Sequence, residues 1–249
     1  MACRLGVLAL GDSITNGGGE LQWGVALQSW ALWVARGLGL PFTTFAVDGA
    51  RAAHVAGEQV PAWRGRSARP EARYDLGCLY AGVNDVRAPD WDPTAFAADH
   101  GAALAALAER CDRLLAVTLP LDLGRPRAGA AVEAANAIIE AAARERGALV
   151  LDLRAFGARN LVMTDHVHPT AFGQVAIAER ALDVLAAAGM AVRVRPSTLI
   201  VPGGRTPLRA LQGDWTYAYR ALKLRARYAG GPARRAVRAA SARSGSSRT

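Results

Sequence analysis

The first 189 residues alternate short, almost wholly apolar runs with longer runs that are rich in Ala and Leu. This alternation constrains the fold most. Strands buried on both faces of a parallel sheet are apolar throughout, whereas the helices that cover them are apolar on one face only. The predicted strands are Leu5–Leu10, Phe42–Val47, Leu76–Ala81, Leu114–Leu119 and Ala148–Leu153. The pattern predicts an α/β fold with a doubly wound sheet of about five parallel strands.

The longer runs are predicted helices, and several of them carry end signals. Asp92 followed by Pro93 is typical of a helix start, and Gly147 and Gly189 stand where helices end. We expect the helices between strands to make right-handed crossovers. The predicted helices are Trp23–Leu38, Pro93–Arg110, Ala128–Arg146 and Pro169–Ala188.

The charge of the chain changes character after residue 189. Residues 190–249 contain 13 basic residues and one acidic residue, whereas residues 1–189 contain 17 basic and 20 acidic residues. The formal net charge of +9 is therefore a property of the carboxyl-terminal segment, and we expect no specific nucleic-acid partner. We expect a globular domain at residues 1–189, a connector with an amphipathic basic helix at 190–229, and a disordered Arg-rich tail at 230–249.

Cysteine content and hydropathy exclude several protein classes. Cys3, Cys78 and Cys111 are too few and too scattered for a disulfide framework, and no CxxC pair is present. This argues against structural zinc and dithiol redox chemistry and indicates a reducing compartment. No apolar run approaches the roughly 20 residues that a membrane span needs, and the first residues lack the pattern of a secretory signal. We therefore expect a cytoplasmic protein.

The residues that follow the predicted strands suit acyl transfer. In doubly wound sheets, ligands bind beyond the carboxyl ends of the strands. Gly11-Asp12-Ser13 follows the first strand, Asp48-Gly49-Ala50 the second and Gly82-Val83-Asn84-Asp85 the third. Asp165-His166-Val167-His168-Pro169 precedes the last helix. Together these segments offer a hydroxyl nucleophile, a glycine amide, a side-chain amide and a carboxylate–imidazole pair, which are the groups that acyl transfer requires.

The spacing and residue types within these segments suggest a chemical role for each residue. Asp165 and His168 stand at i and i+3, so on one helical turn the carboxylate reaches the imidazole Nδ1. Nε2 is then free to take a proton from Ser13 as the serine attacks. Gly49 has no side chain, so its backbone N–H can approach a substrate closely. Asn84 supplies uncharged NH₂ donors, which suit the stabilisation of an oxyanion.

The four segments, in this order, resemble the four blocks of the SGNH, or GDSL, ester hydrolases. GDS at 11–13 is similar to the first block, Gly49 to the second, GVND at 82–85 to the GxND block, and DHVHP at 165–169 to the DxxHP block. The resemblance covers residues 4–189 and implies the flavodoxin-like fold of that family. It implies Ser13 as nucleophile and His168 as base oriented by Asp165. It also implies an oxyanion hole of the Ser13 and Gly49 amides with Asn84.

The resemblance further implies a carboxylic ester hydrolase that works through an acyl-enzyme, with no metal or organic cofactor. The substrate it implies is a small-molecule or lipid ester, such as a short-acyl ester, an acetylated sugar or a lysophospholipid. One position departs from the family pattern. Many members have an asparagine about five residues before the second-block glycine, and Thr44 stands there instead. We expect this to alter the local turn and not the chemistry.

Each of these residues also has a structural interpretation. Ser13 is a common N-cap residue, and Asn84-Asp85 is a common turn. Asp165, His166 and His168 have the residue types of a metal site, although no third cluster with matching spacing is present. The competing function is a non-catalytic binding protein of the same fold, whose basic tail holds polyanions or anionic membranes.

Predictions for the other histidines and the tryptophans follow from their local patterns. His54 and His100 stand in polar contexts, and we expect both to be solvated. Trp30 and Trp33 are spaced for one apolar helix stripe, so we expect them in the core. Trp23 belongs either to the same stripe or to a wall of the acyl pocket.

The carboxyl-terminal segment contains an amphipathic stripe with steps of three and four residues. Its apolar members are Leu208, Leu211, Trp215, Tyr219 and Leu222, with Arg and Lys on the other faces. Such a stripe either docks on the domain or lies on an anionic membrane, where basic residues add affinity. Gly213 weakens an isolated helix by roughly 1 kcal/mol, which favours docking.

Overall fold

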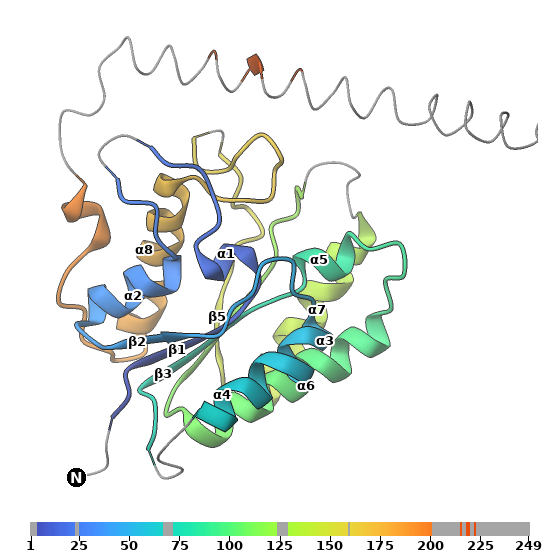
Figure 1. Ribbon diagram of the computed structural model, residues 1–249, viewed down its shortest axis with the longest axis vertical. Coiled ribbons are helices and arrows are strands. Elements are labelled where there is room, and N and C mark those ends of the chain that lie inside the picture. Colours follow the sequence, from blue (N-terminus) through green and yellow to red (C-terminus); the bar gives the residue numbers. More distant parts are fainter. Residues whose placement is uncertain are drawn as a thin grey trace, which may run out of the picture. The chain divides into compact units, whose positions relative to one another are not determined.

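The computed structural model describes residues 4–22, 25–66, 72–123, 129–158 and 160–200, together with Trp215, Ala218, Tyr219 and Leu222 (Figure 1). The chain divides into two compact units, Met1–Gly203 and Gly204–Thr249. The expected functional residues all lie in the first unit, whose fold is described below.

The first unit is built on five parallel strands in the order β2-β1-β3-β4-β5, which confirms the predicted doubly wound sheet. The strands are β1 (Val7–Gly11), β2 (Phe42–Thr44), β3 (Leu76–Tyr80), β4 (Leu114–Val117) and β5 (Leu149–Leu151). Every residue of the central strands β1 and β3 is buried, as their apolar sequences require. Their register pairs Val7 with Leu76 and Gly11 with Tyr80, so both strands end at the same edge of the sheet.

Four of the five strands end earlier than predicted, and side chains bond the backbone of some of the residues that follow. β4, for example, ends at Val117. The backbone N–H of Leu119 then donates to Oδ1 of Asn136 at 2.6 Å, and its carbonyl accepts from Nδ2 at 2.9 Å. Beyond the ladder the chain is thus held by a buried amide rather than by a neighbouring strand.

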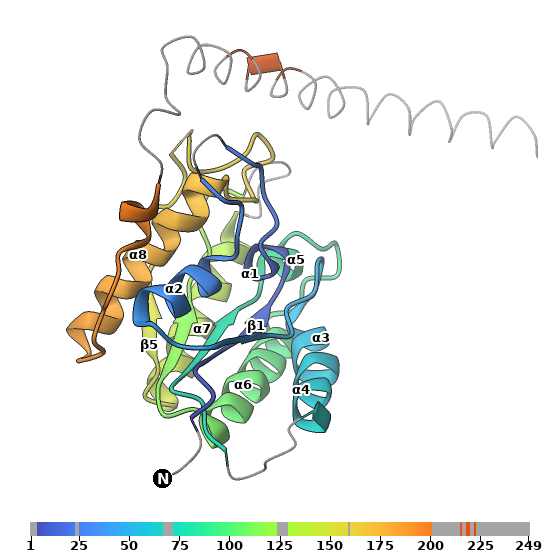
Figure 2. The same cartoon turned by 60° about the vertical axis from the view of Figure 1, so that its left-hand side comes forward.

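Helices cover both faces of the sheet (Figures 1 and 2). One face carries α2 (Trp30–Leu38) and α8 (Ala171–Ala187), which pack side by side. The other carries α6 (Pro93–Arg110), α7 (Ala130–Glu145) and a continuous helical segment made of α3 (Ala52–His54), a π-helix (Val55–Gln59) and α4 (Val60–Arg66). Two short helices, α1 (Ser13–Asn16) and α5 (Val83–Val86), follow β1 and β3 directly.

Three of the four predicted helices begin later than expected. The helix predicted from Ala128 begins at Ala130, and a capping side chain precedes the start of each of the other two. The helix predicted from residue 23 begins at Trp30, because the Ser29 side chain caps it by accepting the N–H of Ala31. The helix predicted from Pro169 begins at Ala171, because Thr170 is its N-cap. Trp30 and Trp33 are buried in the core, as predicted. Trp23 lies outside the described residues.

The helical segment at residues 52–66 was not predicted. Gly57 and Pro61 normally interrupt a helix, and here they coincide with the change from the π-helix to α4. A second correction concerns His100 on α6. We expected this histidine to be solvated, but its side chain is fully buried. The ring packs against Phe96 on the preceding turn.

The expected boundary at residue 189 also differs from the structure, since the first unit extends to Gly203. Residues 190–200 pack on the domain instead of leaving it. The backbone N–H groups of Arg193 and Val194 both donate to the carbonyl of Gly37 at the end of α2. Arg195 forms ion pairs with Glu179 and Asp183 on α8. A 3₁₀ turn (Pro196–Leu199) follows.

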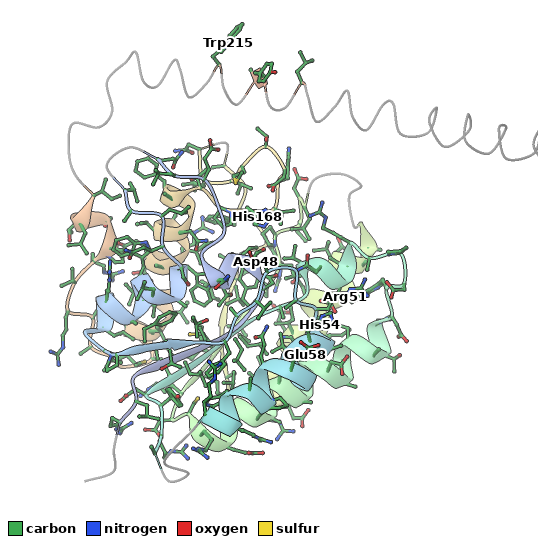
Figure 3. The ribbon with its side chains drawn as sticks, viewed as in Figure 1. Asp48, Arg51, His54, Glu58, His168 and Trp215 are labelled. Carbon is green, nitrogen blue, oxygen red and sulfur yellow. The ribbon has the colours of Figure 1, made fainter. Side chains whose placement is uncertain are left out.

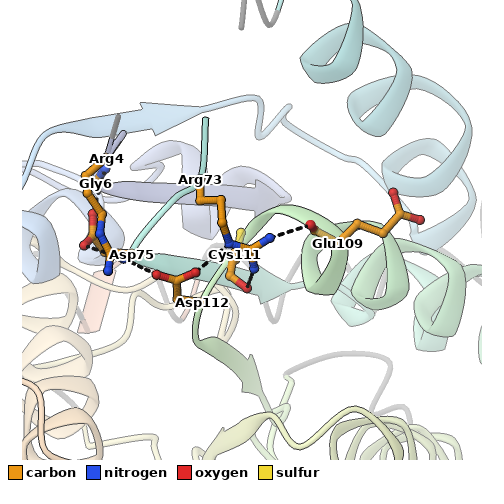
Figure 4. Close-up of polar contacts among 7 residues, drawn as sticks. All are labelled: Arg4, Gly6, Arg73, Asp75, Glu109, Cys111 and Asp112. Atoms are coloured by element: carbon orange, nitrogen blue, oxygen red, sulfur yellow. Dashed lines mark hydrogen bonds and ion pairs between the residues drawn. The ribbon is translucent and has the colours of Figure 1, made fainter. Parts of the chain in front are cut away.

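Ion pairs tie together the amino ends of β1, β3 and β4 (Figure 4). Asp112 accepts hydrogen bonds from both Arg4 and Arg73, and Arg4 also pairs with Asp75 at 3.2 Å. Arg73 donates further to the carbonyls of Glu109 and Cys111, beside the end of α6. These ion pairs brace the amino edge of the sheet, whereas the predicted functional residues follow the carboxyl ends of the strands.

Within the part of the chain that the structure describes, none of the helices combines the length and the hydropathy required to cross a membrane.

Candidate active site

Strand β1 ends in a tight turn that presents Ser13 at the carboxyl edge of the sheet. Gly11 adopts φ +151°, and a Cβ at this position would lie 2.2 Å from the carbonyl oxygen of Tyr80, so only glycine fits. Asp12 is the N-cap of α1 and accepts the N–H of Ile14 at 2.9 Å. Ser13 is the first residue of α1, where a backbone N–H has no partner inside the helix.

Two buried glutamines hold this turn in place. Gln59, on the π-helix, accepts the N–H of Gly11 at 3.0 Å and donates to the carbonyl of the same residue at 2.8 Å. Gln174, on α8, donates to the carbonyls of Ile14 and Gly18 and accepts the N–H of Trp30. The end of β1 is therefore bonded to a helix on one face of the sheet, and α1 to a helix on the other.

Ser13, His168 and Asp165 form a continuous hydrogen-bonded chain. Ser13 Oγ lies 2.9 Å from His168 Nε2, and His168 Nδ1 lies 2.7 Å from Asp165 Oδ2. Ser13 and His168 are separated by 155 residues in sequence, and the fold brings them into contact. Figure 3 shows His168 beside α1, with Asp48 from the segment after β2 on the same edge of the sheet.

Asp165 and His168 are not on a helical turn, as we had predicted, but on an irregular one. Asp165 Oδ1 accepts the backbone N–H groups of Val167 and His168 at 2.9 and 3.0 Å. His166 takes φ +60°, which non-glycine residues rarely adopt. The same i to i+3 contact is thus made by an Asp-stabilised turn.

Three further hydrogen-bond donors lie on the strand-end segments. Gly49 adopts φ +76°, and the space where a side chain would stand is open. In the described part of the chain, the backbone N–H groups of Ser13 and Gly49 have no acceptor. Asn84 Nδ2 donates one of its two hydrogens to the carbonyl of Ala50, at 3.0 Å. The other hydrogen is available to a ligand.

The segment that carries Gly49 is fastened to the loop after β3 by two neighbouring residues. Asn84 bonds the carbonyl of Ala50, and both carboxylate oxygens of Asp85 accept the N–H of Ala52. Thr44 also helps to shape the segment, since its hydroxyl donates to the carbonyl of Ala9 and accepts the N–H of Ala46. The position that departs from the family pattern therefore has a structural role of its own.

The electrostatics of the site favour a charged carboxylate beside the histidine. Hydrogen bonding to Asp165 raises the pKa of His168, although burial and the positive charge of Arg87 oppose this. Burial disfavours the charged form of Asp165, but hydrogen bonds from His168 and from the N–H of Val167 outweigh it, so the pKa of the Asp165 carboxyl is lowered.

A second carboxyl group, that of Asp12, precedes Ser13 in the turn. Asp12 is 1% exposed, and its burial raises its pKa to about 7. Asp12 is therefore only partly ionised near neutral pH, whereas Asp165 is fully ionised. The two acids of the site differ in charge because Asp165 is hydrogen-bonded to His168 and Asp12 is buried.

The remaining predicted residues lie apart from this chain of hydrogen bonds. His166 is exposed, with Nδ1 3.3 Å from a carboxylate oxygen of Asp122. His54 is exposed and accepts the N–H of Arg51. Among the described residues, no three His, Cys, Asp or Glu side chains converge on a point where one cation could be held.

Sequence reasoning missed Gln59, Gln174 and Arg87. A glutamine inside an apolar helical run was the available signal for Gln174, because a buried amide there needs partners from another element. Gln59 had no such signal, since its helix was itself not predicted. Arg87 stands two residues after the GVND segment, but only the folded chain places its charge near His168.

Comparisons with solved structures show the same fold in known enzymes. LAE5, an alpha/beta hydrolase enzyme from the metagenome of Lake Arreo, Spain, is 17% identical with a TM-score of 0.57, over 75% of this chain and 97% of that one. Axe2, an acetylxylan esterase from Geobacillus stearothermophilus, is 18% identical with a TM-score of 0.56, over 78% and 99% of the two chains. TesA is 19% identical with a TM-score of 0.56, over 72% and 97%. No curated protein matches the chain.

A family model decides the assignment, since the solved structures share only the fold at these identities. The GDSL-like Lipase/Acylhydrolase family model matches residues 9–176, which is more than half of the chain. The matched range begins in β1 and ends in α8, and it includes all the strand-end segments described above. With this match and the resemblance of its four sequence blocks, the chain belongs to the GDSL-like lipase/acylhydrolase family and is a carboxylic ester hydrolase.

Proposed function

We propose that the protein cleaves carboxylic esters through an acyl-enzyme formed on Ser13. The observation that carries this proposal is the chain of contacts from Ser13 Oγ to His168 Nε2, at 2.9 Å, and from His168 Nδ1 to Asp165, at 2.7 Å. A serine that serves only as an N-cap does not require a histidine on its hydroxyl, nor a carboxylate behind that histidine.

The first half of the reaction forms the acyl-enzyme. His168 Nε2 takes the proton of the Ser13 hydroxyl while Oγ attacks the ester carbonyl carbon. The tetrahedral intermediate collapses when the bond to the alkoxy oxygen breaks, and the imidazolium returns its proton to the leaving alcohol. Asp165 stays ionised throughout and stabilises the imidazolium, as its lowered pKa supports.

The second half releases the acid. Water gives a proton to His168 Nε2 and its oxygen attacks the acyl carbon. Collapse of the second intermediate breaks the bond to Ser13 Oγ, which recovers its proton. In both halves the backbone N–H groups of Ser13 and Gly49 and the free Nδ2 hydrogen of Asn84 are the donors we assign to the oxyanion. Their support is that none of the three has an acceptor among the described residues.

We propose a short-acyl ester as the substrate. The solved structure of Axe2 is that of an acetylxylan esterase, and acetyl esters are therefore the first class to test. Nitrophenyl esters of graded acyl length measure this preference directly. The expected result is that kcat/KM is highest for the acetyl ester and falls as the acyl chain lengthens.

The mechanism is tested by replacing Ser13 and by labelling it. Ser13→Ala is expected to remain folded and to lose ester hydrolysis, whereas Ser197→Ala, an exposed serine of the 3₁₀ turn, retains it. A fluorophosphonate should add one label to the protein, on the peptide that contains Ser13. Turnover by Ser13→Ala at the rate of the unchanged protein contradicts the mechanism. Absence of both turnover and labelling favours the non-catalytic binding protein instead.

A further inference from the structure

Arg87 lies on the same face of a short helix as the oxyanion-hole residue Asn84. In the turn formed by α5 and its C-cap Arg87, residues 83, 85 and 86 are buried, and Asn84 and Arg87 are the two side chains that reach the surface. Positions i and i+3 of a helical turn share a face. The Asn84 amide uses this face to contact Ala50, next to Gly49, so Arg87 stands on the side of α5 that borders the site.

Among the described residues, Arg87 has no partner for its positive charge. The two carboxylates nearest to it in sequence are engaged elsewhere, since Asp85 accepts the N–H of Ala52 and Asp90 pairs with Arg51. Within the described residues, no acidic side chain or aromatic ring contacts the Arg87 guanidinium. Its charge nevertheless acts on His168, because it opposes the increase in pKa that Asp165 causes there. An unpaired, half-buried arginine therefore lies within electrostatic reach of the catalytic base.

The acids of the site do not neutralise this charge. Asp165 is already hydrogen-bonded to His168 and to the backbone of its own turn. Asp12 is buried and only partly ionised near neutral pH. A guanidinium in such surroundings offers a fork of N–H donors that matches a carboxylate or a phosphate.

We propose that Arg87 binds an anionic group of the substrate, so that the preferred ester carries a carboxylate or phosphate on its acyl or its alcohol part. This inference rests on the proposed ester hydrolysis and adds the charge of the substrate to it. The cation stands at the rim of the oxyanion hole, where it can pair with a group of the substrate that does not react. The binding energy of that pair then selects anionic esters over neutral esters of similar size.

The test compares matched neutral and anionic esters in two arms. The acyl arm uses 4-nitrophenyl butyrate against the mono-4-nitrophenyl ester of glutaric acid. The alcohol arm uses methyl 4-acetoxybenzoate against 4-acetoxybenzoate. The measured quantity is the ratio of kcat/KM for the anionic ester to that for the neutral ester, determined at pH 8, where more of His168 is in its neutral, active form.

In at least one arm, Arg87→Gln is expected to lower this ratio about 10- to 100-fold, the range for loss of one charge-assisted hydrogen bond. Arg87→Lys, which keeps the charge but not the fork, should restore part of the ratio. Arg113→Gln is the matched control, because Arg113 is exposed at the opposite, amino edge of the sheet. This variant should leave both the ratio and the individual rates unchanged.

A second measurement distinguishes loss of the Arg87 charge from a structural change in α5. Removal of the Arg87 charge should raise the apparent pKa of kcat/KM for a neutral ester, because one of the two effects that oppose protonation of His168 is then lost and only burial remains. A variant that merely loosens α5 does not shift this pKa upward. An Arg87→Gln variant that hydrolyses neutral and anionic esters with an unchanged ratio in both arms overturns the inference while ester hydrolysis stands. If the unchanged protein hydrolyses none of the four esters, the proposed function fails and the inference fails with it.

Discussion

Asp165 holds His168 at two atoms with one carboxyl group. Oδ1 accepts the backbone N–H of His168 at 3.0 Å, and Oδ2 lies 2.7 Å from Nδ1 of its ring. The main chain and the imidazole are thereby oriented together, and Nε2 is directed at Ser13 Oγ. This relationship makes Asp165 the residue on which both the tautomer and the pKa of His168 depend.

The first prediction is a pH profile that depends on Asp165. His168 must be neutral to accept a proton, and its folded-state pKa is raised, so kcat/KM should rise with pH through a midpoint above 6.5. Asp165→Asn should move this midpoint downward, because the hydrogen bond to Asp165 is the main cause of the raised pKa. It should also reduce kcat by roughly 10² to 10⁴, because an amide stabilises the wrong tautomer.

The control for this variant is Asp122→Asn, which alters the aspartate beside the exposed His166. This variant should keep the midpoint and the rate of the unchanged protein. If Asp165→Asn also kept both, Asp165 would be a turn-forming residue only.

The second prediction concerns the oxyanion. Asn84→Ala should lower kcat by about 10² to 10³ with a smaller effect on KM, since the lost donor acts mainly in the transition state. Ser13 should still react with a fluorophosphonate, because the serine and its base are untouched. Asn160→Ala, which changes an exposed asparagine, should have no effect. An Asn84→Ala variant that alters KM alone would show that the amide binds substrate and does not stabilise the intermediate.

The third prediction tests the buried Gln59 amide that holds the turn before Ser13. Gln59→Met keeps the volume of the side chain but leaves the N–H and carbonyl of Gly11 without their partner. Each unsatisfied buried group costs roughly 1 to 3 kcal/mol, so the loss of partners for two groups should lower the free energy of unfolding by about 2 to 6 kcal/mol. Denaturant unfolding measures this change. The adjacent exposed residue provides the control, and Glu58→Met should change the unfolding free energy by less than about 0.5 kcal/mol.

The fourth prediction concerns acid stability and His100. Burial lowers the pKa of this histidine to about 4, and neither ring nitrogen has a hydrogen-bond partner among the described residues. A lowered histidine pKa stabilises the fold above the unfolded-state value of about 6.5, and this stability is lost as the pH falls toward 4. The loss amounts to roughly 3 kcal/mol.

His100→Leu should therefore make thermal melting less sensitive to pH between 6.5 and 4. His54→Leu, at an exposed histidine, should leave the pH dependence of the melt as it is. An equally steep loss of stability in His100→Leu would assign the acid sensitivity to other groups.

The fifth prediction concerns the carboxyl-terminal segment. Trp215, Tyr219 and Leu222 of its apolar stripe are helical, while the other members of the stripe lie outside the described residues. Deletion of 230–249 should leave melting and ester turnover unchanged, because this tail has almost nothing to bury. Deletion of 207–249 should lower the melting temperature, as expected if the stripe packs on the domain.

Sedimentation with anionic vesicles distinguishes the other interpretation of this segment. If the longer deletion leaves the melt unchanged but ends vesicle binding, the stripe is a membrane-binding helix. Loss of activity on deletion of 230–249 alone would make the tail part of the active site.

Local patterns in the sequence were sufficient for the architecture of the domain. Apolar runs predicted all five strands, and a capping aspartate followed by proline placed α6 at Pro93–Arg110 without error. These features depend on the periodicity of apolar residues and on hydrogen bonds between residues that are close in sequence. A short stretch of sequence is therefore enough to predict them. The order of Ser13, Gly49, Asn84 and the Asp165–His168 pair could also be predicted from local patterns. Each of these residues stands after a predicted strand or in a turn.

Only the tertiary structure decided which partners these residues meet. The 2.9 Å contact between Ser13 and His168 spans 155 residues, and the amides of Gln59 and Gln174 bond backbone groups on other elements. The burial of His100 and Asp12, and the absence of a partner for Arg87 among the described residues, likewise depend on what the fold packs around them. Hydrogen bonds and pKa values are set by neighbours in space, and a local pattern carries no information about neighbours that are distant in sequence.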